Sequence, residues 1–104
     1  MKFKLFFDTS DRNQIIVKLF KNNEIIASLV KEQQLTSQAL LPLIEEIFKI
    51  LKISTKDIFE IEINQGPGSY TGLKVGAAVA NALGWFLDIP VNGKKNNIVN
   101  PVYK

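Results

Sequence analysis

The sequence predicts an α/β domain, in which two helices pack on a mixed sheet of about five strands in the order β-β-β-α-β-α-β. Short runs rich in Ile, Val and Phe, which are typical of strands, fill the first third of the chain and recur at residues 58–63. Two longer segments, residues 37–52 and 72–87, have the composition and apolar spacing of helices. No repeat, linker or low-complexity tract interrupts them, so residues 1–104 are predicted to form a single domain.

The composition excludes several classes of protein. At 104 residues and 46% hydrophobic, the chain has enough apolar surface for a core. The net charge of +3 is a mild bias, and Arg12 is the only arginine, which argues against a dedicated nucleic-acid binder. The sequence has no cysteine and no histidine, so a disulfide framework, thiolate catalysis and the usual zinc ligands are excluded.

The apolar segments are too short for export or for a membrane. The run at the N-terminus ends at Asp8 and lacks a small-residue cleavage site. The most apolar stretch, residues 75–87, is shorter than the ~20 residues that a spanning helix needs. We therefore expect a cytoplasmic protein without a membrane partner, and a buried helix at residues 75–87.

The first three strands are predicted to form an antiparallel meander. Residues 3–7 are rich in aromatic side chains and are closed by turn formers at residues 8–11. Residues 14–20 and 24–30 are rich in Ile and Val, and the polar residues 21–23 separate them. Such short connections favour pairing between consecutive antiparallel strands.

The first helix is predicted from one apolar stripe between residues 37 and 52. Its members recur at spacings of three and four: Leu40, Leu43, Ile44, Ile47, Phe48 and Leu51. Pro42 conflicts with this pattern, because a proline inside a helix removes a hydrogen bond and clashes with the preceding turn. Either the helix begins near Leu41 or it bends there.

The remaining elements follow in order. Residues 54–57 read as a cap and a single turn, and residues 58–63 as the fourth strand. After the second helix, Ile89-Pro90-Val91 begins another extended segment, and residues 92–97 form a polar turn that contains Asn-Gly. Residues 98–102 are a last possible strand, which their proline confines to a sheet edge.

A glycine-rich loop joins the fourth strand to the second helix. Free N–H groups at a helix N-terminus favour an anion, and glycines allow its close approach. The residues of this candidate phosphate loop are Gly66, Gly68, Ser69, Thr71 and Gly72. The spacing fits neither G-x-G-x-x-G nor G-x-x-x-x-G-K-[ST]. The alternative is a tight strand-to-helix turn, capped by Ser69 or Thr71.

The second helix carries a ridge of small residues. Gly72, Gly76, Ala80 and Gly84 recur every four residues, so they lie along one side of the helix, where another backbone can approach closely. The other positions are apolar around much of the circumference. The helix is either buried within its own domain or packed against a partner helix, and the small size of the domain favours a partner.

The segment from residue 65 to residue 76, QGPGSYTGLKVG, resembles the G-P-G-S-[FY]-T-G-[LV]-[RK]-[IV]-G signature of the TsaB family. FDTS at 7–10, LLPLI at 40–44 and IPV at 89–91 are similar to further TsaB segments in the same order. The resemblance covers nearly the whole chain and includes Pro42. It implies the N-terminal lobe of an actin-like (ASKHA, ribonuclease H-like) protein.

The resemblance also implies a function. TsaB is the non-catalytic partner of TsaD, which transfers a threonylcarbamoyl group to a tRNA adenosine, in a complex that also requires a TsaE-like ATPase. The chain lacks the histidine pair that holds the TsaD metal, and it has Thr36-Ser37 where TsaB sequences commonly have His-Ser. We therefore expect an accessory subunit without catalytic residues, cofactor or metal, which contacts tRNA only indirectly.

Two sets of site residues follow from the resemblance. Asp8, Thr9 and Ser10 are a nucleotide-site remnant, unless they only cap a hairpin. The interface with a TsaD-like subunit, or with a second copy of the chain, is expected on both helices: Gly72, Gly76, Ala80, Leu83, Gly84, Leu40, Ile44 and Ile47. The competing hypotheses are a minimal homodimeric nucleotide-binding module with a phosphate loop at residues 66–72, and a shortened remnant without a partner.

Overall fold

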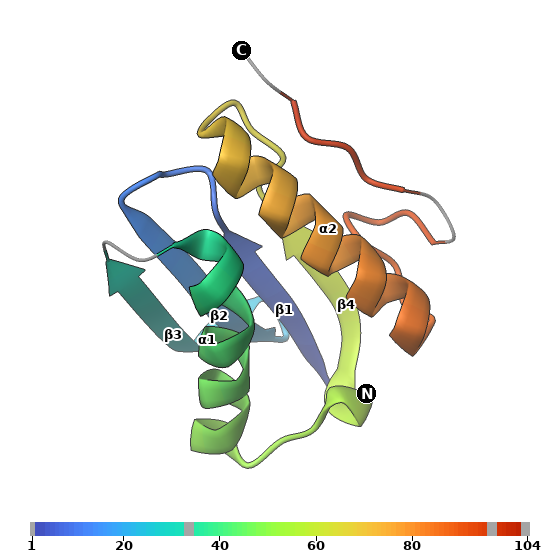
Figure 1. Cartoon of the computed structure of the whole chain (residues 1–104). Coiled ribbons are helices and arrows are strands. Elements are labelled where there is room, and N and C mark those ends of the chain that lie inside the picture. The colour runs from blue at the N-terminus through green and yellow to red at the C-terminus, as the bar shows by residue number, and fades with distance from the viewer. Residues whose placement is uncertain (1, 33–34, 96–97, 103–104) are drawn as a thin grey trace.

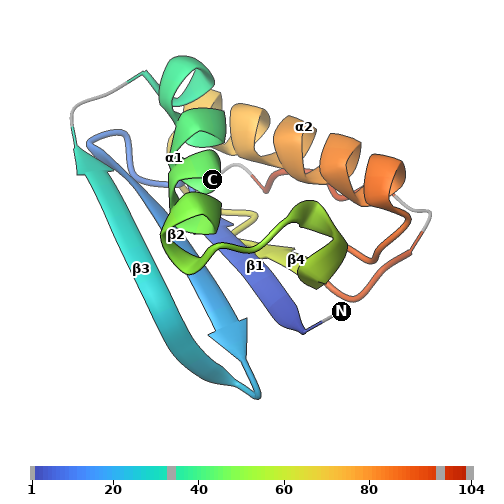
Figure 2. The same cartoon turned by 90° about the horizontal axis from the view of Figure 1, so that it is seen from below.

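The computed structural model describes residues 2–32, 35–95 and 98–102. A four-stranded sheet in the order β3-β2-β1-β4 carries two helices on one face (Figures 1 and 2). The elements in chain order are β1 (Phe3–Asp8), β2 (Gln14–Lys21), β3 (Glu24–Glu32), α1 (Thr36–Leu51), a 3-10 turn (Thr55–Asp57), β4 (Ile58–Ile63) and α2 (Tyr70–Leu87). The predicted α/β class is therefore confirmed.

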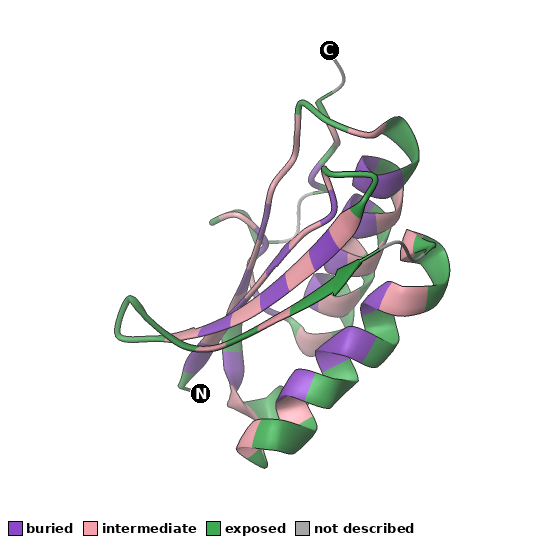
Figure 3. Cartoon of the chain, turned by 90° about the vertical axis from the view of Figure 1, so that its left-hand side faces the viewer, coloured by how far each residue is buried: buried purple, intermediate pink, exposed green. Residues whose placement is uncertain are grey.

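The first three strands form the predicted antiparallel meander, and β4 pairs with β1 in parallel. Asn22 and Asn23 both have positive φ, which suits the tight hairpin between β2 and β3. Side chains of β1 and β2 alternate between the helix-covered face and the open face of the sheet. In Figure 3 buried residues recur along the central strands and both helices, and β3 is a largely exposed edge strand.

Both helices begin earlier than the sequence indicated. α1 begins at Thr36, so Pro42 lies inside it and not at its start. Its apolar stripe packs on the sheet as predicted, with Leu40, Leu43, Ile44 and Ile47 buried. α2 begins at Tyr70, where the Ser69 side chain accepts a hydrogen bond from the Gly72 N–H at 3.3 Å and caps the helix. No helix within the described residues is long and apolar enough to cross a membrane.

The predicted strand near the C-terminus does not form in the described residues. Val91 makes only isolated bridges, parallel to Ile61 and antiparallel to Lys94. The physical reason is Asn92, whose side chain accepts a hydrogen bond from the Ile63 N–H at 2.8 Å and donates one to the Ile63 carbonyl at 3.2 Å. A side-chain amide thus pairs with main-chain groups that a fifth strand would use. The predicted count of about five strands is corrected to four.

Candidate functional site

The two candidate loops meet at one edge of the sheet. β1 and β4 are parallel neighbours, so the turn after β1 and the glycine-rich loop after β4 leave the sheet at the same end. The Ser69 N–H donates to the Ser10 carbonyl at 2.7 Å, and Thr9 Oγ1 donates to the Gly72 carbonyl at 2.7 Å. The structure therefore brings together two sets of residues that lie far apart in the sequence.

The Asp8 carboxylate is engaged by its own surroundings. Oδ1 accepts hydrogen bonds from the Ser10 N–H at 2.9 Å and from Ser10 Oγ at 2.7 Å. Oδ2 accepts one from Asn64 Nδ2 at 3.2 Å, and Asn64 Oδ1 in turn accepts from the Gly66 N–H at 2.9 Å. This arrangement matches the hairpin-cap alternative for residues 8–10. The described residues contain no group of three or more His, Cys, Asp or Glu side chains that could hold a metal ion.

Asn64 is a positioning residue that sequence reasoning did not single out. Its side chain joins the turn at Asp8 to the loop at Gly66, and it lies only one residue beyond β4. The one signal in the sequence was an amide side chain at the carboxyl end of a predicted strand, two residues before a glycine. Such a residue commonly bonds to nearby main chain.

The glycines of the loop make room for the chain itself. A Cβ added at Gly68 would lie 2.5 Å from the Ser10 carbonyl oxygen, and one at Gly72 would collide with the carbonyl oxygen of Thr9. Gly66 has φ +117°, a conformation that side-chain-bearing residues rarely adopt. These contacts favour the tight turn, capped by Ser69, over a phosphate loop.

The small-residue ridge of α2 faces inward. A Cβ added at Gly76 would collide with Thr9 Oγ1, and one at Gly84 would lie 2.5 Å from Val91 Cγ2. Ala80 is fully buried. The ridge thus admits the turn after β1 and the chain after α2, so the prediction that it receives a partner helix is corrected.

Most of the other predicted interface residues are also internal. Leu40, Ile44 and Ile47 belong to the hydrophobic core, because the α1 stripe that they form covers the sheet. Of the eight predicted interface residues, all except the half-buried Leu83 are buried. Periodicity identified the stripes correctly, but it could not tell which stripe faces the sheet.

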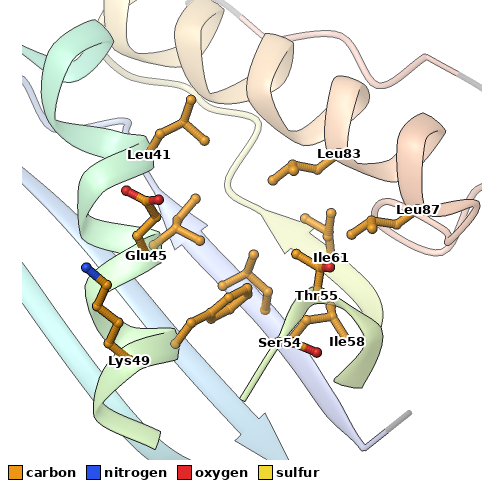
Figure 4. Close-up of a pocket in the computed structure, with 12 residues that line it drawn as sticks. Leu41, Glu45, Lys49, Ser54, Thr55, Ile58, Ile61, Leu83 and Leu87 are labelled. Carbon is orange, nitrogen blue, oxygen red and sulfur yellow. The ribbon is translucent and has the colours of Figure 1, made fainter. Parts of the chain in front are cut away.

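An apolar hollow of about 430 Å³ lies between the two helices, above the sheet (Figure 4). Leu83 and Leu87 point into it from α2, and Leu41 lies on the α1 side. Its floor includes Leu5 and Ile61 of the sheet. Its rim carries the polar side chains Glu45, Lys49, Ser54 and Thr55.

A second hollow of about 550 Å³ continues over α2, and it shares Leu41 and Leu83 with the first. Trp85 and Phe86, which are 83% and 78% exposed, lie on it. We call the residues that line this second hollow the outer apolar face: Leu41, Ala78, Val79, Ala82, Leu83, Trp85 and Phe86. Exposed apolar clusters of this kind mark interaction sites.

Comparison with known proteins agrees with this fold. Residues 24–94 match the family model of TsaD, tRNA N6-adenosine threonylcarbamoyltransferase. The Bacillus subtilis protein TsaB, a tRNA threonylcarbamoyladenosine biosynthesis protein, is 30% identical over 88 residues, which are 85% of this chain and 38% of the relative. The tRNA N6-adenosine threonylcarbamoyltransferase of Nitrosospira multiformis is 50% identical over 54 residues, which are 52% of this chain and 16% of the relative.

Solved structures give the same picture. YeaZ from Pseudomonas aeruginosa has a TM-score of 0.79 and 26% identity, over 88% of this chain and 42% of that one. A Bacteroides thetaiotaomicron protein with an actin-like ATPase fold has a TM-score of 0.56 and 17% identity, over 93% of this chain and 35% of that one, and it supports the fold alone. The chain spans less than half the length of these relatives. It belongs to the TsaD family and is a TsaB-like protein with an actin-like fold.

Proposed function

We propose that the chain is a non-catalytic, TsaB-like partner protein in tRNA threonylcarbamoyladenosine biosynthesis, and that it pairs with a TsaD-like subunit through its outer apolar face. The observation that carries the proposal is the exposure of Trp85 and Phe86 beside the other residues of that face. The similarity to TsaB along most of the chain supports the pathway.

The outer apolar face has the features of a surface for a partner helix. Ala78 and Ala82 lie four residues apart on the exposed side of α2, so a second backbone can come close between them. Trp85 and Phe86 supply large side chains of the type that dominates binding energy at interfaces. Lys74 is the only charged residue of α2, so little desolvation of charge opposes the burial of this helix.

The contacts at the glycine-rich loop support an accessory role. The Asp8 carboxylate holds the turn after β1, and the space at Gly68 and Gly72 is taken by main chain. Under this proposal the TsaD-like subunit supplies the transfer chemistry and the contact with tRNA, and a TsaE-like ATPase joins the larger complex. The complex would work in the cytoplasm.

Phe86→Asp tests this proposal. A charge on the outer apolar face is expected to lower the affinity for the TsaD-like subunit of the same organism by at least about tenfold, because a buried, unpaired carboxylate is unfavourable. Titration calorimetry with both full chains measures the affinity. Ile50→Asp is the matched control, because Ile50 is also exposed (56%) but does not line either hollow.

Two outcomes contradict the proposal. One is that the unchanged chain forms no complex with the folded TsaD-like subunit at tens of micromolar, well above the dissociation constants of stable complexes. The other is that Phe86→Asp and Ile50→Asp bind equally well. A stable homodimer that ignores the TsaD-like subunit would support the nucleotide-binding module, and calorimetry with ATP and magnesium would then test that hypothesis.

A further inference from the structure

Residues 98–102 lie beside α2 and return toward the glycine-rich loop (Figure 1). We call residues 98–102 the strap. They belong to no helix or strand of the chain, and yet Val99 within them is only 4% exposed. Neither the proposed function nor the outer apolar face explains why this segment is held in place.

The rest of the chain binds the main-chain groups of the strap. Asn81 of α2 binds both main-chain groups of Val99: its Oδ1 accepts from the N–H at 2.9 Å and its Nδ2 donates to the carbonyl at 2.9 Å. Gln65 Nε2 donates to the Asn100 carbonyl at 2.7 Å, and the Val102 N–H donates to the Gln65 carbonyl at 2.6 Å. All four bonds would form with any extended segment that has an N–H at the positions of Val99 and Val102.

Side chains add one apolar anchor and a shape requirement. Val99 is buried, whereas Ile98 and Val102 are exposed, so a single aliphatic side chain fixes the position of the strap. At the far end, the Val102 carbonyl occupies the space where a Cβ of Gly66 would lie. Gly66 therefore permits the close approach of the strap as well as the turn of its own loop.

We propose that the flank of α2 between Asn81 and Gln65 is a binding groove for an extended peptide, which the chain's own residues 98–102 fill in cis and which the same sequence, supplied as a separate peptide, fills in trans once the cis segment is displaced. The occupant is set by the contacts described: an aliphatic residue at the Val99 position, followed by an extended main chain that Gln65 binds. Trp85 is the one residue of the outer apolar face that also lines a hollow beside this site.

The cis strap competes with any ligand in trans. A tethered segment has an effective concentration in the millimolar range, so a free peptide at micromolar concentration cannot displace it. Weakening the strap at Val99 removes this competition and leaves the groove residues unchanged. The groove should then accept the same sequence supplied as a separate molecule.

The test uses the full chain with Val99→Asp, which replaces the anchor by a charge, and a synthetic peptide of residues 98–104, IVNPVYK. Trp85 is the only tryptophan, and it lines a hollow of about 190 Å³ together with Ile98. Its fluorescence therefore reports occupancy of the groove. We expect saturable binding to Val99→Asp, and binding at least about tenfold weaker to the unchanged chain, because its own strap competes.

Two controls define the groove. Adding Asn81→Ala to Val99→Asp removes two of the four main-chain bonds and should abolish the peptide signal. Adding Ala78→Leu, a change on the outer apolar face at a residue that does not line the hollow beside Ile98, should leave it unchanged. Circular dichroism checks that each variant is folded.

Either of two results would overturn the proposal. The first is a folded Val99→Asp chain that gives no saturable binding of the peptide at millimolar concentration. The second concerns folding: should Val99→Asp fail to fold, Val99→Pro, which removes the N–H bond to Asn81, fixes φ and keeps an apolar side chain, is tested with the same peptide. If both variants unfold, residues 98–102 are an inseparable part of the core and not a ligand of a groove.

Discussion

The inner and outer faces of α2 both carry small residues four positions apart, but their surroundings are very different. The inner face carries Gly72, Gly76, Ala80 and Gly84, which are all buried, and the three glycines lie against the turn after β1 or the chain after α2. The outer face carries Ala78 and Ala82, again four residues apart, with Trp85 and Phe86 exposed beside them. The inner face is already packed within the chain. The outer face also has small residues that would let another backbone come close, but it is exposed.

The difference shows what small residues in a helix mean in this fold. On the inner face they permit backbone contact inside the chain, since added Cβ atoms at Gly72 and Gly76 would collide with Thr9. On the outer face Ala78 and Ala82 are exposed. Under the proposed function, the partner would pack against them as Thr9 packs against the inner residues.

The largest effect is expected at Gly76. Gly76→Leu places a branched side chain where Thr9 lies, and neither Thr9, which hydrogen-bonds to α2, nor the helix can move away freely. We expect the free energy of unfolding to fall by about 3 kcal/mol or more, at the upper end of overpacking effects. Urea unfolding followed by circular dichroism measures the change. An unchanged midpoint would mean that the inner face is not closely packed.

The sequence was sufficient for the fold but not for the orientation of α2. Strand and helix periodicity predicted the elements through residue 87, because periodicity is a pattern within one segment. The TsaB resemblance predicted their arrangement, because its motifs follow one another in order along nearly the whole chain. Which side of α2 meets the sheet depends on contacts with Thr9 and Val91. Thr9 lies far from α2 in the sequence, and Val91 comes after the helix. A helix that is apolar all round contains no information about this choice.

The candidate site shows the same limit. The residues at both loops were found from local motifs, but their contacts with each other and with Asn64 depend on the parallel pairing of β1 with β4. The last strand was predicted wrongly: Asn92 bonds to the main chain of β4 where another strand would pair, and residues 98–102 bond to the side chains of Asn81 and Gln65, outside the sheet. Neither periodicity nor composition reveals that side-chain amides replace the main-chain bonds of a strand.

A smaller effect on stability is expected at Thr9, the residue after β1 that packs against the inner face of α2. Thr9→Val keeps the shape of a buried side chain, 2% exposed, and removes the hydrogen bond to the Gly72 carbonyl. The cost should be about 1 to 2 kcal/mol, the usual range for a lost buried hydrogen bond. Thermal unfolding detects it. Thr9→Ser, which keeps the hydroxyl, is the control, and an equal loss in both variants would indicate that packing and not the hydrogen bond matters.

The smallest effect on stability is expected on the outer face, at the counterpart of Gly76. Ala78→Leu adds the same leucine to the same helix, but at an exposed position, so the free energy of unfolding should change by less than about 0.5 kcal/mol. Its affinity for the TsaD-like subunit should nevertheless fall at least about tenfold, because a partner helix loses its close approach. Urea unfolding and calorimetry on the same sample separate the two quantities. If Ala78→Leu lowers stability as much as Gly76→Leu does, both faces are internal; if it lowers neither stability nor affinity, the outer face does not bind the partner.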